Sequence, residues 1–224
     1  MGVVFQRWRR VAADETTPTV SSFGAVPVAS LADGHGAIAL RDDESVWIGF
    51  DAADGHVCVA RVLALGTELV DAVTGEAPTE GLDPRAQNYI VLPPQYALTG
   101  RTVSPRCARQ FVRGAEGPHH EAITELHVTV YRSIAEPTVR DDERTYARGR
   151  GATRPGRADV PTCGVPGHVP QVIQEDAGVH TWDTTRAWQA RIEVLAGDEY
   201  RRRTGQAPLP PAAPDASYGG WRLP

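Results

Sequence analysis

The stretch 125–134, ELHVTVYRSI, has the clearest strand pattern in the chain. Leu126, Val128 and Val130 fall on alternate positions, and polar residues separate them. Alternation with a period of two, together with β-branched side chains, indicates a strand that buries one face. We therefore expect this stretch to lie in a sheet, with its three apolar side chains in the core.

Other strands are expected on the N-terminal side of this one. The segment 37–65 contains three apolar runs, which are separated by the turn-like strings RDDES and DAADG. Asp and Gly tolerate the backbone angles of turns, so the segment predicts an antiparallel meander. NYIVLPPQY at 88–96 and RCARQFVRG at 106–114 add further strands.

Two short helices are expected where the string T-G-x-A-P occurs, in VTGEAP at 73–78 and in RTGQAP at 203–208. The segments 61–78 and 191–208 align without a gap, and each predicts a strand, a capped helix, a glycine stop and a proline exit. Thr67 is the expected cap of the first helix, and acids precede arginines in the second. Either an ancient duplication or convergence on one capping pattern accounts for the match.

These elements predict an α+β protein, mainly antiparallel β-sheet of meander or sandwich type, with two short helices and a proline-rich C-terminal arm. We divide the chain into an N-terminal arm (1–36), a β-rich core domain (37–135), a linker or long loop rich in Gly, Pro and Arg (136–178), and a strand–helix unit (179–224). The last unit is too short to hold a core alone, so it should dock on the core domain or on a neighbour.

The composition excludes several function classes. Hydrophobic residues make up 41% and charged residues 23% of the 224 positions, as in ordinary globular proteins. The net charge of −5 argues against duplex DNA as the main partner. The chain has no lysine, which rules out Schiff-base, Walker-type and Ser–Lys chemistry and points to a GC-rich bacterial genome.

The expected location is the cytoplasm. Cys58, Cys107 and Cys163 are odd in number and widely spaced, so we expect reduced thiols and no disulfide framework. No stretch approaches the roughly 20 apolar residues that a membrane helix needs, and no export signal is recognised at the N-terminus.

Catalytic motifs are missing, so we assign no catalytic residue, no metal site and no cofactor, and lean against an enzyme. Position 124 is Thr124, which breaks the zinc-protease pattern after His120. Cys107 lies among arginines that could lower its thiol pKa, although a packed thiol is the simpler interpretation. The candidates kept for a thiol-dependent enzyme or a small-molecule binder are Cys107, His120 and His127.

The preferred function is a non-catalytic structural or interaction protein that self-associates or binds another protein. The C-terminal unit combines aromatic side chains with the extended segment PLPPAAP, which can clasp a neighbour or strap its own surface. The expected interaction residues are Trp182, Trp188, Pro208, Pro210, Pro211, Tyr218 and Trp221.

A second alternative is a single-stranded RNA-binding accessory protein. The segment 144–157, RTYARGRGATRPGR, is basic and contains one aromatic residue, a pattern that can grip single strands. Acidic residues flank it and dilute the field, so a flexible linker is the favoured interpretation and nucleic acid is an unlikely partner. The arginines concerned are Arg144, Arg148, Arg150, Arg154 and Arg157.

Four motifs give the chain a likeness to known sequences: LPPQ at 92–95, RQFVRG at 109–114, LHVTVYRS at 126–133, and TGQAPLPP at 204–211 followed by Gly-Gly-Trp. With these motifs the chain resembles a group of uncharacterised bacterial and fungal proteins over roughly 45–131 and 188–222. It departs from the group at 96–98, where Tyr-Ala-Leu replaces a Trp-Leu-Asp string. The resemblance implies a shared β-rich fold and carries no functional residues.

Overall fold

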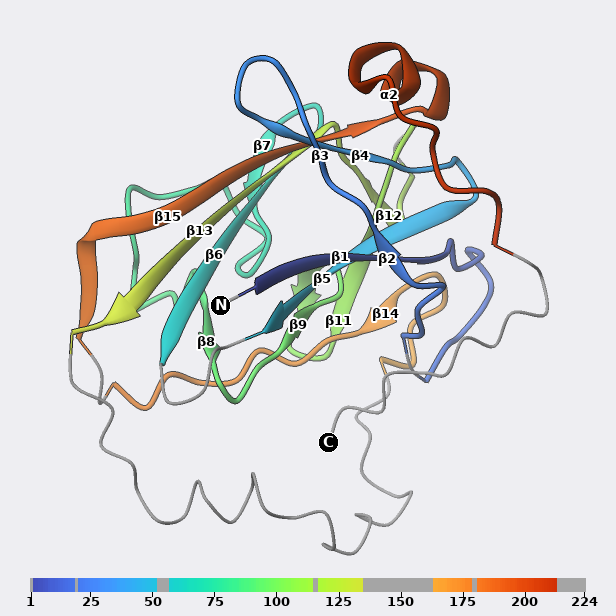
Figure 1. The fold of residues 1–224 in the computed structure, drawn as a ribbon. Coiled ribbons are helices and arrows are strands. Elements are labelled where there is room, and N and C mark those ends of the chain that lie inside the picture. Colours follow the sequence, from blue (N-terminus) through green and yellow to red (C-terminus); the bar gives the residue numbers. More distant parts are fainter. Residues whose placement is uncertain are drawn as a thin grey trace, which may run out of the picture.

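Two packed β-sheets and a single helix make up the described part of the computed structural model, which covers residues 2–18, 20–51, 57–114, 117–134, 163–178 and 181–212 (Figure 1). Neither sheet closes on itself. The protein is therefore mostly β, and the predicted α+β class with two helices is wrong. The second expected helix is missing because the first T-G-x-A-P segment folds as a strand and a turn.

The first sheet follows the order β10-β11-β5-β1-β2, with β9 paired to β5 and with β12 and β14 paired to β11. Its strands are β1 (Gly2–Arg9), β2 (Ala25–Val26), β5 (Glu44–Asp51), β9 (Ala97–Leu98), β10 (Arg101–Ser104), β11 (Cys107–Val112), β12 (His120–Ala122) and β14 (Val169–Pro170). Strand β1 pairs with β5 over its whole length. Residues 1–36, expected to form an arm, thus supply an inner strand of this sheet.

The second sheet follows the order β3-β4-β15-β13-β6-β7, and β8 also pairs with β6. Its strands are β3 (Ala29–Ser30), β4 (Gly36–Ala39), β6 (Cys58–Leu65), β7 (Leu69–Asp71), β8 (Ile90–Leu92), β13 (Glu125–Ser133) and β15 (Trp182–Leu195). Strand β13 pairs antiparallel with β6 on one side and with β15 on the other. The C-terminal unit therefore docks on the core through β15.

The main core lies between the two sheets, and β13 contributes to it as the alternation predicts. Leu126 and Val128 are fully buried, and Val130 is nearly so. They belong to one cluster with Ile48 and Phe111 of the first sheet. The strand prediction for 125–134 is confirmed, because Glu125–Ser133 form β13. Complete burial of an apolar side chain of this size stabilises the fold by about 1.5–3 kcal/mol.

The first expected helix, after Thr67, does not form. Residues 69–71 instead make β7, which pairs with β6. The buried carboxylate of Asp71 accepts the backbone N–H groups of Val73 (3.0 Å) and Thr74 (3.3 Å), and its other oxygen accepts Nε of Arg61 (3.1 Å). A side chain that binds nearby backbone N–H groups competes with helical hydrogen bonds. This contact with Arg61 of β6 is not visible in the local sequence pattern.

The two T-G-x-A-P strings nevertheless share one local structure. Gly75 and Gly205 adopt φ values of 76° and 72°, in the left-handed region that favours glycine. Each glycine donates its N–H to the carbonyl four residues earlier, Asp71 at 2.8 Å and Arg201 at 2.9 Å. The string thus specifies a turn that glycine closes, and it does not specify the preceding helix.

Helix α2 (Gly197–Thr204) does form where the second string predicts it. Acidic residues occupy its first turn and arginines its last, the arrangement that the helix dipole favours. Tyr200 is fully buried in a small cluster with Ala29, Leu31 and Ala37. The helix therefore packs on the edge of the second sheet near β3 and β4 (Figure 1).

The start of the proline-rich segment packs against other parts of the same molecule. Arg7 of β1 is buried, and its Nη1 donates to the carbonyl of Pro210 at 2.7 Å and to Oε1 of Glu44 at 3.2 Å. Pro208 lies beside Gly197 at the start of α2. The described part of the arm is a strap over its own surface. Tyr218 and Trp221 lie outside the described residues.

Cys107 and Cys163 form a disulfide that ties β11 to the segment before β14, and Cys58 is a buried free thiol. The expectation of three reduced cysteines is therefore wrong. Wide spacing along the chain does not exclude a bond, because the antiparallel pairing of β14 with β11 brings the two cysteines together.

Loss of this disulfide should destabilise the fold. Because the bond closes a chain loop with a sequence separation of 56, we expect Cys163→Ser to lower the free energy of unfolding by about 2–4 kcal/mol. Urea unfolding followed by tryptophan fluorescence measures the change. Reductant should destabilise the natural sequence and leave Cys163→Ser unaffected. Three alkylatable thiols in the denatured, non-reduced protein would contradict the pairing.

Candidate functional site

The three candidate catalytic residues do not form one site. Cys107 is bonded to Cys163, so it offers no thiolate while the disulfide is intact. His120 lies on β12 in the first sheet, whereas His127 lies on β13 in the second. Among the described residues, none of the three contacts another, and they offer no nucleophile–base pair.

His120 is held as a neutral imidazole. Its Nε2 lies 2.9 Å from the carbonyl oxygen of Val11, and Nη2 of Arg10 lies 3.3 Å from its Nδ1. A carbonyl only accepts and a guanidinium only donates, so Nε2 carries the proton and Nδ1 does not. Burial lowers the pKa of His120, and the charge of Arg10 acts in the same direction. The residue is a structural link between the first sheet and the segment after β1.

Two more histidines lie near His120. The rings of His119 and His168 meet edge to face, with centroids 5.6 Å apart. Nδ1 of His119 is buried without a hydrogen-bond partner in the described residues, and Nδ1 of His168 lies 3.0 Å from the carbonyl of Pro166. Among the described residues, these histidines do not bring their nitrogens close enough together to form a candidate metal cluster.

His127 belongs to a charged network on the outer face of the second sheet. Oε1 of Glu125 is shared between Nε2 of His127 and Nε of Arg191, the latter at 2.8 Å. Burial alone would raise the pKa of Glu125, but the hydrogen bonds from Arg191 and His127 outweigh it and the pKa is lowered. The carboxylate is thus ionised and satisfied, as in an ion-pair network.

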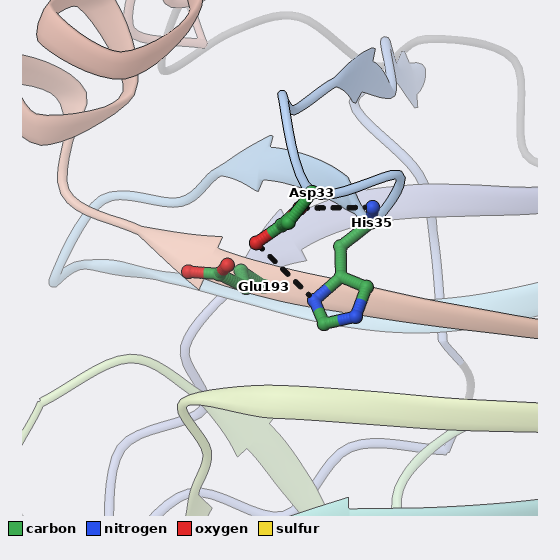
Figure 2. A group of neighbouring side chains, drawn as sticks. All are labelled: Asp33, His35 and Glu193. Atoms are coloured by element: carbon green, nitrogen blue, oxygen red, sulfur yellow. Dashed lines mark hydrogen bonds and ion pairs between the residues drawn. The ribbon is translucent and has the colours of Figure 1, made fainter.

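Figure 2 shows a second group on the same sheet, formed by Asp33, His35 and Glu193. Asp33 and His35 come from the turn between β3 and β4, and Glu193 comes from β15. One ligand atom from each residue lies within 4.8 Å of the other two. This group was not predicted from the sequence, because Glu193 is distant along the chain from Asp33 and His35.

A shallow cleft of about 550 Å³ is lined by residues at the ends of strands from both sheets. Its rim includes Arg113 and Glu199, and both are already engaged, Arg113 by Asp42 and Glu199 by Arg202. No histidine or cysteine is among the described residues that line it. The cleft has room for a small molecule but lacks the converging polar groups that mark most binding sites.

Some of the predicted interaction residues pack against the protein itself, and Trp188 is exposed to solvent. Trp182 packs edge to face with Tyr89, with ring centroids 6.4 Å apart, so it belongs to a minor core. Trp188 is 53% exposed. Pro208 and Pro210 belong to the strap over the protein's own surface, and Pro211 follows it in the chain.

Trp188 is uncovered although it lies on the core side of β15. It is the cross-strand partner of Val130, and directly paired residues point to the same face of a sheet. Further along that face Ile192 is buried, and Val28, from the link between β2 and β3, lies near it beside Gly36. The link therefore covers one end of β15 and leaves the Trp188 end open in the described residues.

The predicted RNA-binding arginines lie outside the described residues, so their role stays a prediction. They are Arg144, Arg148, Arg150, Arg154 and Arg157.

Helix α2 is the one helix in the described ranges, and it is not long and apolar enough to cross a membrane. Comparison with protein-family models, with curated proteins and with solved structures found no match to this chain. The resemblance to bacterial and fungal proteins stays a prediction.

The geometry of His120 predicts an acid-sensitive fold. Its pKa lies below the ordinary value of 6.5, so the unfolded chain binds the proton more readily. The stability that His120 contributes is present above pH 6.5 and is lost as the pH falls through the lowered folded-state pKa. We expect His120→Gln to be less sensitive to acid than the natural sequence in urea unfolding between pH 7.5 and pH 5.

His127→Gln, on the other sheet, is the matched control and should keep the steep acid dependence of the natural sequence. Equal acid dependence of His120→Gln and the natural sequence would show that another group is responsible.

Proposed function

We propose that this chain is a non-catalytic structural or interaction protein that self-associates, and that Trp188 of β15 lies at the centre of the contact. The observation that carries the proposal is an indole on the core side of a sheet that remains 53% exposed. Tryptophan is among the residues most enriched at the energetic centres of protein interfaces. A second copy that covers Trp188 would complete the packing that the fold leaves open.

Two other exposed apolar side chains lie near the two ends of β15. Val28 is 46% exposed next to the buried end of β15, and Ile134 is 63% exposed where its N–H binds the carbonyl of Thr181, just before β15. With Trp188 they account for three of the six well-exposed large apolar side chains in the described residues.

The contact should form through side chains and not by edge-to-edge strand pairing. The outer edge of β15 carries no partner strand before Ile192 in the described residues, where β4 begins to pair. The register shifts between Tyr131 and Ser133, which pair with Ala187 and Trp182, so residues 183–186 bulge out of the ladder. Bulges at sheet edges prevent strand addition, which leaves face-to-face burial of Trp188.

The alternatives are weaker on the same observations. A thiol-dependent enzyme needs a free Cys107, and the disulfide removes it. The RNA-binding alternative rests on residues outside the described ranges. The disulfide also favours an oxidising compartment over the expected cytoplasm, where thiols are kept reduced.

Substitution of Trp188 should weaken self-association. We expect the natural sequence to form a homo-oligomer, with a mass that is a multiple of the 24.1 kDa chain, and Trp188→Ser to shift towards the monomer. Loss of an interface-centre tryptophan costs about 2 kcal/mol or more, which corresponds to roughly 30-fold weaker association. Size-exclusion chromatography with light scattering over a range of concentrations measures the shift.

Tyr96→Ser is the matched control, because Tyr96 is a 41% exposed aromatic residue next to β9 in the other sheet. It should leave the mass unchanged. Circular dichroism and thermal unfolding should be similar for both variants. A monomer at every concentration of the natural sequence, or an oligomer that Trp188→Ser does not weaken, would refute the proposal.

A further inference from the structure

The turn between β3 and β4 holds Asp33 and His35 in fixed positions. Leu31 and His35 are joined by a backbone hydrogen bond of 2.8 Å, and Gly34 has a φ of 84°, which favours glycine at this point. Oδ1 of Asp33 accepts the backbone N–H of His35 at 3.0 Å.

The remaining donor atoms face one another. Oδ2 of Asp33 lies 3.6 Å from Nδ1 of His35, and a carboxylate oxygen of Glu193 completes a triangle with no side longer than 4.8 Å (Figure 2). Two ligand atoms bound at about 2.1 Å around a tetrahedral ion lie about 3.4 Å apart. A small inward rotation of the side chains would therefore bring all three donors to bonding distance of one ion.

Arg203 of α2 competes for the same carboxylate. It makes a bidentate ion pair with Glu193, with Nη2 at 2.9 Å from Oε1, and its charge also acts on Asp33. Both partners are partly exposed, and ion pairs of that kind contribute little to stability. A divalent ion that also binds Asp33 and His35 can therefore replace the guanidinium of Arg203 at Glu193.

We propose that Asp33, His35 and Glu193 form a binding site for a divalent transition-metal ion of the zinc type, which exchanges with the guanidinium of Arg203 at Glu193. One imidazole nitrogen and two carboxylate oxygens suit Zn²⁺, Co²⁺ or Ni²⁺, whereas Ca²⁺ and Mg²⁺ prefer sites made only of oxygens. With three protein ligands, the fourth coordination position of a tetrahedral ion is open to water. The site is independent of the Trp188 contact.

Titration of the full chain with ZnCl₂ by isothermal titration calorimetry tests the proposal. Co²⁺ serves as a second probe, because its visible absorption reports tetrahedral coordination. We expect one ion per chain. His35→Ala should weaken binding by roughly tenfold or more because one of three donors is lost. Arg203→Gln should strengthen it, because the variant removes the competitor and its positive charge.

His127→Ala is the matched control, since His127 is a similarly exposed histidine beside a glutamate on the same sheet. It should bind as the natural sequence does. Absence of binding to the natural sequence, binding that survives His35→Ala, loss of binding in His127→Ala, or unchanged affinity in Arg203→Gln would each overturn the proposal. Arg203→Gln keeps the test decisive even if His35→Ala perturbs the turn.

Discussion

The antiparallel pairing of β13 with β6 on one side and with β15 on the other holds this protein together. It unites three segments that are far apart in the chain, and it turns Leu126, Val128 and Val130 towards the first sheet. Without it the C-terminal unit, which is too short for a core of its own, would have no partner for its apolar face.

Strand β15 then determines where the surface features lie. Its C-terminal end pairs with β4, supports α2 and brings Glu193 to Asp33 and His35. The link between β2 and β3 does not reach its other end, and Trp188 is exposed there in the described part of the chain. The charged group and the exposed indole are thus two consequences of one long strand, and neither depends on the other.

Local sequence patterns predict those parts of the fold that local forces decide. Alternation marks β13, and the acidic start and basic end of 197–204 mark α2. The helix expected after Thr67 fails because Asp71 binds Arg61 and its own turn, a contact that only the folded sheet creates. The disulfide and the Glu193 group escape prediction for the same reason, because each joins residues that become neighbours through strand pairing. Trp188 can be predicted as an interaction residue because it is a tryptophan. Its exposure cannot be predicted, because it depends on which part of β15 the link between β2 and β3 covers.

We propose that a second copy of this chain covers the end of β15 that carries Trp188. Hydrogen-exchange mass spectrometry at concentrations below and above the association range tests it most directly. We expect peptides covering 182–191 to gain protection as the concentration rises, and peptides covering 97–104 to exchange at an unchanged rate. Unchanged exchange of 182–191 in an oligomer, or protection confined to another part of the chain, would contradict it.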